Sequence, residues 1–307
     1  MRYTLLVLAL VFAFFFALPG EAPAGPYFMC PVDCESVSTL YPYAKGPSED
    51  IMALQQELRQ LGLYTGAING VYDESTLAAV RKFQRINHLQ PNGIVDKGIW
   101  EALARSVEPA TKESKTPHPR GEVAVIIDTE RRKLIVLDDG MPHRVYPCAV
   151  GKPETPSPVG NWRIKRKAAH WGSGFGTRWL GLSVPWGIYG IHGTNKPGSI
   201  GTYASHGCIR MFNSHVEELY PWVKVGTPVY IIGNPLGLNP RPVLVLNSRE
   251  PAVLEVQRVL AKKGYYKGPI DGIFGSNMLK AVIQFRKDNK LPYDDRVDGK
   301  MYELLGL

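Results

Sequence analysis

The chain has 307 residues, 44% of them hydrophobic and 21% charged, and a formal net charge of +8. This length allows two or three domains, and the composition is ordinary for a globular protein. The excess of Lys and Arg favours polyanionic partners, but no run of five like charges and no basic-aromatic alternation argues for DNA or RNA, so we expect no nucleic-acid partner.

The N-terminal residues have the order of a secretory signal peptide. Arg2 precedes a nearly unbroken apolar run from Leu5 to Leu18, and Ala-Pro-Ala follows at 22–24. We therefore expect residues 1–24 to direct secretion and to be removed afterwards. The run is short for a membrane-spanning helix and no second one follows, although an uncleaved N-terminal anchor stays open as the alternative.

The chain has four cysteines, which allow three pairings if all are oxidised. Cys30 and Cys34 lie four residues apart in the N-terminal segment 25–47 and can pair with each other, a question that stays open. Cys148, in the apolar run RVYPCAV, is expected to be a buried small hydrophobe. Cys208 lies in a different environment, described below.

The sequence contains an internal repeat. The segment that starts at Gln55 recurs around Gln257, and matched glycines and phenylalanines keep one constant offset of 202 residues, without a gap. A constant offset indicates one module used twice. We assign the first module to residues 48–106 and the second module to residues 247–307.

Each module is predicted to be a three-helix unit of about fifty residues with a small core. Apolar residues recur at helical spacing in two segments of the first module, and Asp73 or Ser75 can cap its second helix. A short third helix is expected at about 96–103 in the first module and at about 298–305 in the second.

A central domain, residues 121–233, lies between a polar, Pro-rich linker at 107–120 and a Gly/Pro-rich linker at 234–246. Short β-branched runs occur at 123–127, 133–137, 144–150, 161–165 and 227–232. They predict an all-β sandwich or barrel with one inserted helix. That helix is expected near Ser214, with a Ser214–Glu217 capping box, and Pro221 should kink it or end it early.

The glycine-rich, aromatic segment Lys167–Leu182 is unlike an ordinary strand. We interpret it as a lid or rim loop whose Trp171, Phe175 and Trp179 are candidate substrate contacts. The alternative is a surface loop held in place by one buried Trp.

The segment Ile191–Met211, IHGTNKPGSIGTYASHGCIRM, contains the parts of an activated thiol. A thiol with its free pKa of about 8.5 is mostly protonated at neutral pH, so a catalytic cysteine needs an imidazole or oriented amides to hold its thiolate. Cys208 follows His206 by two residues and His192 by sixteen. Gly193 and Gly207 let the backbone approach a substrate and turn N–H groups toward a developing oxyanion. The pattern predicts a cysteine nucleophile.

Two other interpretations of this segment remain. Cys208 can be structural, or it can bind a metal together with His192, His206 and His215, but the spacing matches none of the usual zinc patterns. We therefore expect no metal and no organic cofactor. A nucleophilic Cys208 also predicts that no disulfide forms between Cys148 and Cys208.

The HGT at 192–194 followed by SHGCIR at 205–210 resembles the signature of the L,D-transpeptidase (YkuD-type) family, over about residues 122–233. Both repeats, through AINGVYDESTLAAVRKFQ and PIDGIFGSNMLKAVIQFR, resemble the peptidoglycan-binding module of wall-remodelling enzymes. The resemblance implies a multidomain α+β chain: a mainly-β catalytic domain between two small three-helix peptidoglycan-binding domains. Four module aromatics are either core residues or ligand contacts: Tyr64, Tyr72, Tyr266 and Phe274.

The resemblance also implies roles for residues of the site. Cys208 would be the nucleophile, His192 the base oriented through the Gly193 backbone, and His206 an aid in holding the thiolate. The Gly207 and Cys208 amides would stabilise the oxyanion. The remaining substrate-binding candidates are Ser205, Tyr189, Trp179 and Arg210, whose guanidinium suits a stem carboxylate or, alternatively, a structural ion pair.

The expected partners are therefore peptidoglycan stem peptides and glycan, with the chain in the cell wall or periplasm. Carbapenem-type inhibitors are expected to acylate the thiol, and we expect a monomer. The implied reaction is 3-3 cross-linking with release of D-Ala from a tetrapeptide. An L,D-carboxypeptidase that uses the same cysteine, and an inactive wall-binding protein, stay open as alternatives.

Overall fold

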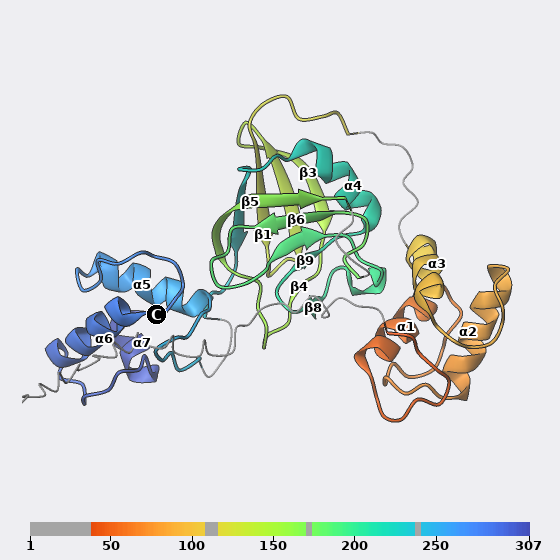
Figure 1. The fold of residues 1–307 in the computed structure, drawn as a ribbon, viewed down its shortest axis with the longest axis horizontal. Coiled ribbons are helices and arrows are strands. Elements are labelled where there is room, and N and C mark those ends of the chain that lie inside the picture. Colours follow the sequence, from red (N-terminus) through yellow and green to blue (C-terminus); the bar gives the residue numbers. More distant parts are fainter. Residues whose placement is uncertain (1–37, 108–115, 170–173, 237–240) are drawn as a thin grey trace, which may run out of the picture.

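The computed structural model describes residues 38–107, 116–169, 174–236 and 241–307. The expected signal peptide and the Cys30–Cys34 segment lie outside the described residues. Figure 1 shows a central domain built on a curled β-sheet, with one helical module on each side of it. Each of the three units has its own hydrophobic core. The mainly-β domain between two helical domains that the sequence predicts is thus confirmed.

The first module consists of α1 (Glu49–Gln60), α2 (Glu74–Ile86) and α3 (Lys97–Val107). Asp73 caps α2, as predicted, by accepting a hydrogen bond from the Thr76 amide at 2.9 Å. The buried Gln55 holds the α1–α2 loop, because its Oε1 accepts from the Gly70 amide and its Nε2 donates to the Val71 carbonyl, both at 3.0 Å. A polar side chain can be buried at low cost when its donors and acceptors are satisfied in this way.

The second module repeats this design with α5 (Pro251–Lys262), α6 (Ser276–Asp288) and α7 (Gly299–Leu305). Gln257, the counterpart of Gln55, accepts from the Gly272 amide at 2.8 Å and donates to the Ile273 carbonyl at 2.9 Å. The two copies are therefore alike in fold and in their internal loop anchor. The four module aromatics left open above, Tyr64, Tyr72, Tyr266 and Phe274, are all buried in the module cores.

The described residues of the central domain form ten strands, a short 3-10 helix η2 (Pro197–Ser199) and one α-helix, α4 (Asn213–Trp222). Eight strands form one sheet in the order β3-β2-β1-β10-β5-β6-β7-β9, and β4 pairs with β8 in a separate two-stranded sheet. The strands are β1 (Val123–Asp128), β2 (Lys133–Asp138), β3 (Met141–Pro147), β4 (Val150–Gly151), β5 (Gly160–Ala168), β6 (Trp179–Leu182), β7 (Gly190–His192), β8 (Tyr203–Ser205), β9 (Ile209–Arg210) and β10 (Pro228–Ile232).

Two local predictions for the central domain are wrong. The lid loop is shorter than expected, because Lys167 and Ala168 continue β5 and Trp179 begins β6. The capping box does not form: α4 begins one residue before Ser214, and its cap position is held by Phe212, which makes no side-chain capping bond. Pro221 lies in the last turn of α4, so the helix ends early as predicted. None of the helices in the described ranges is long and apolar enough for a membrane crossing.

Candidate active site

Two short strands bring the histidine and the cysteine of the motif together. β7 and β9 pair in parallel, with Ile191 opposite Ile209 and His192 opposite Arg210. The Met211 amide donates to the His192 carbonyl at 2.8 Å and extends this pairing. Since Cys208 directly precedes β9, its backbone lies beside the strand that ends at His192.

Aromatic rings surround both side chains. Cys208 is fully buried in a small cluster with Phe175 and Trp179. The His192 ring, also buried, stacks on Trp179 with ring centroids 5.5 Å apart and meets Phe175 edge-on at 5.0 Å. Trp179 is 2% exposed and belongs to β6, so it forms the inner wall of the site and not the lid that we expected. Trp171 lies outside the described residues.

The ring of His192 has a defined orientation. Its Nδ1 contacts the carbonyl oxygen of Gly193, the next residue in the chain. Because a carbonyl only accepts, a neutral ring in this position carries its proton on Nδ1 and its lone pair on Nε2. That tautomer is the one that a general base needs. Gly193 has no room for a side chain, since a Cβ there would lie 2.2 Å from Asn213 Oδ1.

Ser205 holds the turn that presents Cys208. Its hydroxyl donates to the Cys208 carbonyl at 2.6 Å and accepts from the Gly207 amide at 3.1 Å. The Gly207 amide is thus hydrogen-bonded within the turn, and the oxyanion roles expected of the Gly207 and Cys208 amides stay predictions. Gly207 is required for another reason: its φ is +107°, and a Cβ would lie 2.6 Å from the Tyr189 ring.

The other residues of the motif lie close by in the fold. Arg210 is buried, and its backbone exchanges two hydrogen bonds of 2.9 Å with Ala149. His206 is half-buried at the end of β8. Cys148 and Cys208 are both free and buried, as the nucleophile hypothesis predicts, and burial raises the pKa of the Cys148 thiol to about 12. A thiol with such a pKa is inert at neutral pH.

The proposed alternative of a metal site is not formed. His215, its fourth candidate ligand, lies on α4 and packs against Tyr146 and Phe212 with ring centroids 5.0 and 5.2 Å away. Over the described ranges, no group of three or more His, Cys, Asp or Glu side chains is arranged to hold a metal ion. The Cys208 thiol and the oriented His192 imidazole pack against the same two rings, those of Phe175 and Trp179.

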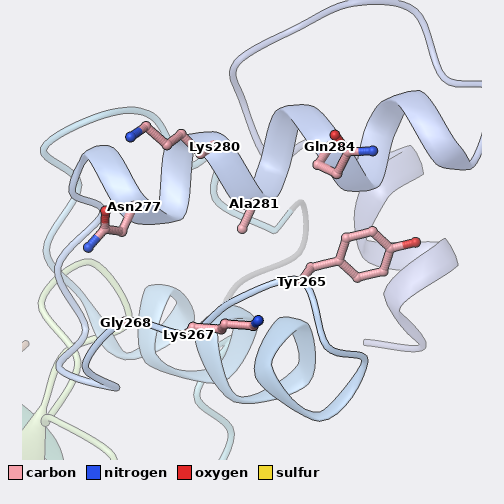
Figure 2. A pocket seen from close by; sticks show the side chains of 7 residues that line it. All are labelled: Tyr265, Lys267, Gly268, Asn277, Lys280, Ala281 and Gln284. Carbon is pink, nitrogen blue, oxygen red and sulfur yellow. The ribbon is translucent and has the colours of Figure 1, made fainter.

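A cavity lies in the second module, and sequence reasoning missed it. Figure 2 shows this cavity of about 450 Å³ between α6 and the loop that follows α5. Its lining residues are Tyr265, Lys267, Gly268, Asn277, Lys280, Ala281 and Gln284. The first module has Thr65 and Ala78 where the second has Lys267 and Lys280. A comparison of the two repeats could therefore have shown that only the second carries this pair of lysines.

Known proteins match this chain along all three units. The L,D-transpeptidase catalytic domain family (YkuD) matches residues 122–231, and the peptidoglycan binding domain family matches residues 47–103 and 249–305. YqjB of Bacillus subtilis (strain 168), named as a candidate L,D-transpeptidase, is 34% identical over 140 residues, which are 41% of this chain and 79% of that protein.

Other similar proteins cover less of the chain or differ more in sequence. YkuD of Bacillus subtilis (strain 168), named in the same way, is 49% identical over 88 residues, or 29% of this chain. This chain therefore spans about half (52%) of the length of that relative. The crystal structure of an L,D-transpeptidase from Xylanimonas cellulosilytica DSM 15894 is 24% identical, with coverage of 63% of this chain and 98% of that one and a TM-score of 0.33.

The domain matches agree with the resemblance read from HGT and SHGCIR, and YqjB is matched over most of its length. The chain therefore belongs to the L,D-transpeptidase family, with a YkuD-type catalytic domain between two peptidoglycan-binding domains.

Proposed function

We propose that this chain is a secreted peptidoglycan L,D-transpeptidase that forms 3-3 cross-links through a Cys208 acyl-enzyme. The observation that carries the proposal is that β7 and β9 pair so that Cys208 and His192 share the ring of Trp179, while the Gly193 carbonyl fixes the His192 ring at Nδ1. A thiol beside an imidazole of fixed tautomer has the parts of a nucleophile and its base. The N-terminal signal-peptide pattern supports export.

In the first step, His192 Nε2 takes the thiol proton and Cys208 Sγ attacks the carbonyl carbon between the third stem residue and the terminal D-Ala. The Cys208 amide donates to the oxyanion that forms. The C–N bond then breaks, His192 returns the proton to the leaving amine, and D-Ala departs. The third residue remains bound to Cys208 as a thioester.

In the second step, the neutral side-chain amine of the third residue of another stem attacks the thioester carbon. A C–N bond forms, the C–S bond breaks, and His192 passes the proton of the amine to the Cys208 thiolate. The product joins the third residues of two stems. Water in place of the amine would release a tripeptide, which is the L,D-carboxypeptidase alternative.

We assign wall contact to the cavity of the second module (Figure 2). Lys267 and Lys280 both line it and bring two positive charges to one concave surface. Stem peptides end in carboxylates, so these ammonium groups would attract them. The pairing of a wall-binding module with a catalytic domain raises the local concentration of substrate at Cys208.

The test is mass spectrometry of the products after the protein meets purified disaccharide-tetrapeptide, with Cys208→Ala as the inactive variant and Cys148→Ala as the matched control. A dimer that lacks one D-Ala supports transpeptidation, and tripeptide alone supports the carboxypeptidase. If the wild type gives no product and a carbapenem adds no mass to Cys208, while the protein still binds intact wall, the inactive wall-binding alternative is correct.

A further inference from the structure

The first module contacts the loop that joins the two parts of the active site. This loop runs from Gly193 through η2 to β8, and so connects His192 to the turn that carries Cys208. Helices α1 and α3 both contact η2. In Figure 1 the first module (red to orange) lies on the side of the central domain opposite the second module.

A buried ion pair lies at the centre of this contact. Lys196 Nζ is 2.5 Å from Asp50 Oδ1, and the two side chains are only 13% and 18% exposed. Gln56 on the same helix donates from Nε2 to the Gly198 carbonyl at 2.9 Å. A buried ion pair adds little to stability, since desolvation offsets most of its attraction, but it fixes one geometry strongly.

Glu57 makes the contact closer still. It is fully buried, and a Cβ at Gly198 would lie 2.9 Å from its Cγ. Among the described residues its carboxyl oxygens have no hydrogen-bond partner of normal geometry, and burial raises the pKa of Glu57 well above its usual range, against the opposing effect of the Gly198 amide and Lys196. Burial of this carboxyl group against η2 therefore favours its neutral, protonated form.

A second ion pair reaches the other half of the site. Lys152 Nζ is 2.5 Å from Glu49 Oε1, at the first turn of α1. The Lys152 amide donates to the Ser205 carbonyl at 2.9 Å, and Ser205 holds the Cys208 turn. The charges of Lys152, His206 and Lys196 lower the pKa of Glu49, so α1 also faces His206 electrostatically.

From η2 the path to His192 is short. The Lys196 amide donates to the Thr194 hydroxyl at 3.0 Å, and the Thr194 carbonyl accepts from Asn213 Nδ2 at 3.0 Å. Gly193, which precedes Thr194, is the residue whose carbonyl contacts His192 Nδ1. Lys196 is thus three residues from Gly193, whose carbonyl contacts the ring of His192.

We infer that the first module is a working part of the active site, in which Asp50 and Glu49 are positioning residues. They act through Lys196 and Lys152 and hold in register the segments that carry His192 and Cys208. The inference rests on the proposed function of that pair.

The repeat itself supports this inference. At the positions of Glu49, Asp50, Gln56 and Glu57 the second module has Pro251, Ala252, Arg258 and Val259. The second module forms the same three helices without these groups. The module fold therefore does not require the acidic face of α1, and the contact with η2 is what distinguishes the first copy.

The test is the rate at which a carbapenem acylates Cys208, followed by intact-protein mass spectrometry, in Asp50→Ala and Lys196→Met. We expect each to slow acylation about tenfold or more, because small displacements of catalytic groups have effects of this size. In the tetrapeptide reaction kcat should fall while KM stays nearly constant. The double variant Asp50→Lys with Lys196→Asp reverses both charges and should recover part of the rate. Such recovery would not occur if the single variants were slow because they had lost their fold.

The control is Glu101→Ala on α3, which removes an exposed ion pair with Lys97 and should leave the rate unchanged. If the wild type reacts and both Asp50→Ala and Lys196→Met react as fast as the wild type, the inference is wrong and the proposed function stands. If the wild type itself is inert toward carbapenem and tetrapeptide, the proposed function fails and the inference with it.

Discussion

The two helical modules have the same fold but meet the central domain with opposite chemistry. The first uses the charged and polar face of α1, through Asp50–Lys196 and Gln56–Gly198. The second uses an apolar contact. Leu254 joins the core of the central domain, and the Trp186 ring packs so closely on Gly272 that a Cβ at this glycine would lie 2.4 Å from the ring. Figure 1 shows the two modules on opposite sides of the sheet.

The difference indicates that the second module is attached to the central domain, whereas the first positions residues of the site. Burial of apolar surface stabilises a contact in proportion to area, with little demand on exact geometry. Charged groups in a buried contact stabilise only one arrangement. Leu254 corresponds by position to Met52, which is 42% exposed in the first module whereas Leu254 is 3% exposed. The same module position is thus a docking residue in the second copy and a surface residue in the first.

The largest expected effect lies between the modules, at the thiol. Cys208→Ala should abolish product formation and carbapenem addition, because no other described thiol is poised to react: the Cys148 pKa is raised to about 12. Thermal melting should change little, since one buried sulfur is lost. Product mass spectrometry and a melting curve measure both. Activity that persists in Cys208→Ala would contradict a mechanism in which Cys208 is the nucleophile.

Trp186→Ala should break the apolar contact of the second module. The Trp186 ring is fully buried, packs edge-on against Trp162 at 5.2 Å and covers Gly272. Loss of a large buried ring costs about 3–5 kcal/mol. We expect a lower melting temperature for the central domain, and a second module that is cleaved more rapidly by protease. An unchanged melting curve would show that this contact does not stabilise the chain.

A rise in pH should loosen the first module through Glu57. The pKa of Glu57 is raised well above its usual value when α1 is docked, so the docked form binds the proton more tightly. The Glu57 contribution to docking is full below the usual glutamate pKa of about 4.3 and is lost as pH rises through the raised pKa, whereas the lowered pKa values of Asp50 and Glu49 confine the loss of their ion pairs to acid pH. Small-angle scattering against pH should show an expansion that Glu57→Gln abolishes. If Glu57→Gln expands over the same pH range as the wild type, another titrating group causes the expansion.

The smallest effect is expected in the cavity of the second module. Lys280→Ala, which introduces the residue of the first copy, removes one exposed charge from that cavity. The loss of binding to insoluble wall should correspond to about 0.2–1 kcal/mol, the usual range for an exposed ion pair. A sedimentation assay with Lys97→Ala as control measures it. Equal binding by wild type and Lys280→Ala would remove this cavity from the wall-binding surface.

Local patterns in the sequence predicted much of this molecule. The repeat was readable because each copy keeps its own helical spacing and its buried glutamine, Gln55 or Gln257. The candidate nucleophile and base could be named from the sequence because glycine, histidine and cysteine stand at informative spacing within one segment. The long strands β1, β2, β5 and β10 were likewise predicted, since β-branched runs identify them.

The rest depends on contacts between distant residues. Strands β6, β7 and β9 are short and buried, and β8 has only three residues, so none of them shows a readable alternation of polar and apolar residues. Trp179 was taken for a lid residue because its glycine-rich neighbours hide a strand. Asp50 and Glu57 look like the solvent face of an amphipathic helix, and only their contact with Lys196 and Gly198, more than a hundred residues away, reveals a docking surface.

Exchange of one residue between the copies tests the central difference most directly. Asp50→Ala gives the first module a residue of the second, and Leu254→Met gives the second module a residue of the first. The measurement is the rate constant for acylation of Cys208 by a carbapenem in both variants and the wild type. We predict that Asp50→Ala lowers the rate about tenfold or more and that Leu254→Met leaves it unchanged. Equal rates in all three proteins, or an equal loss in both variants, would contradict the division between a positioning module and an attached one.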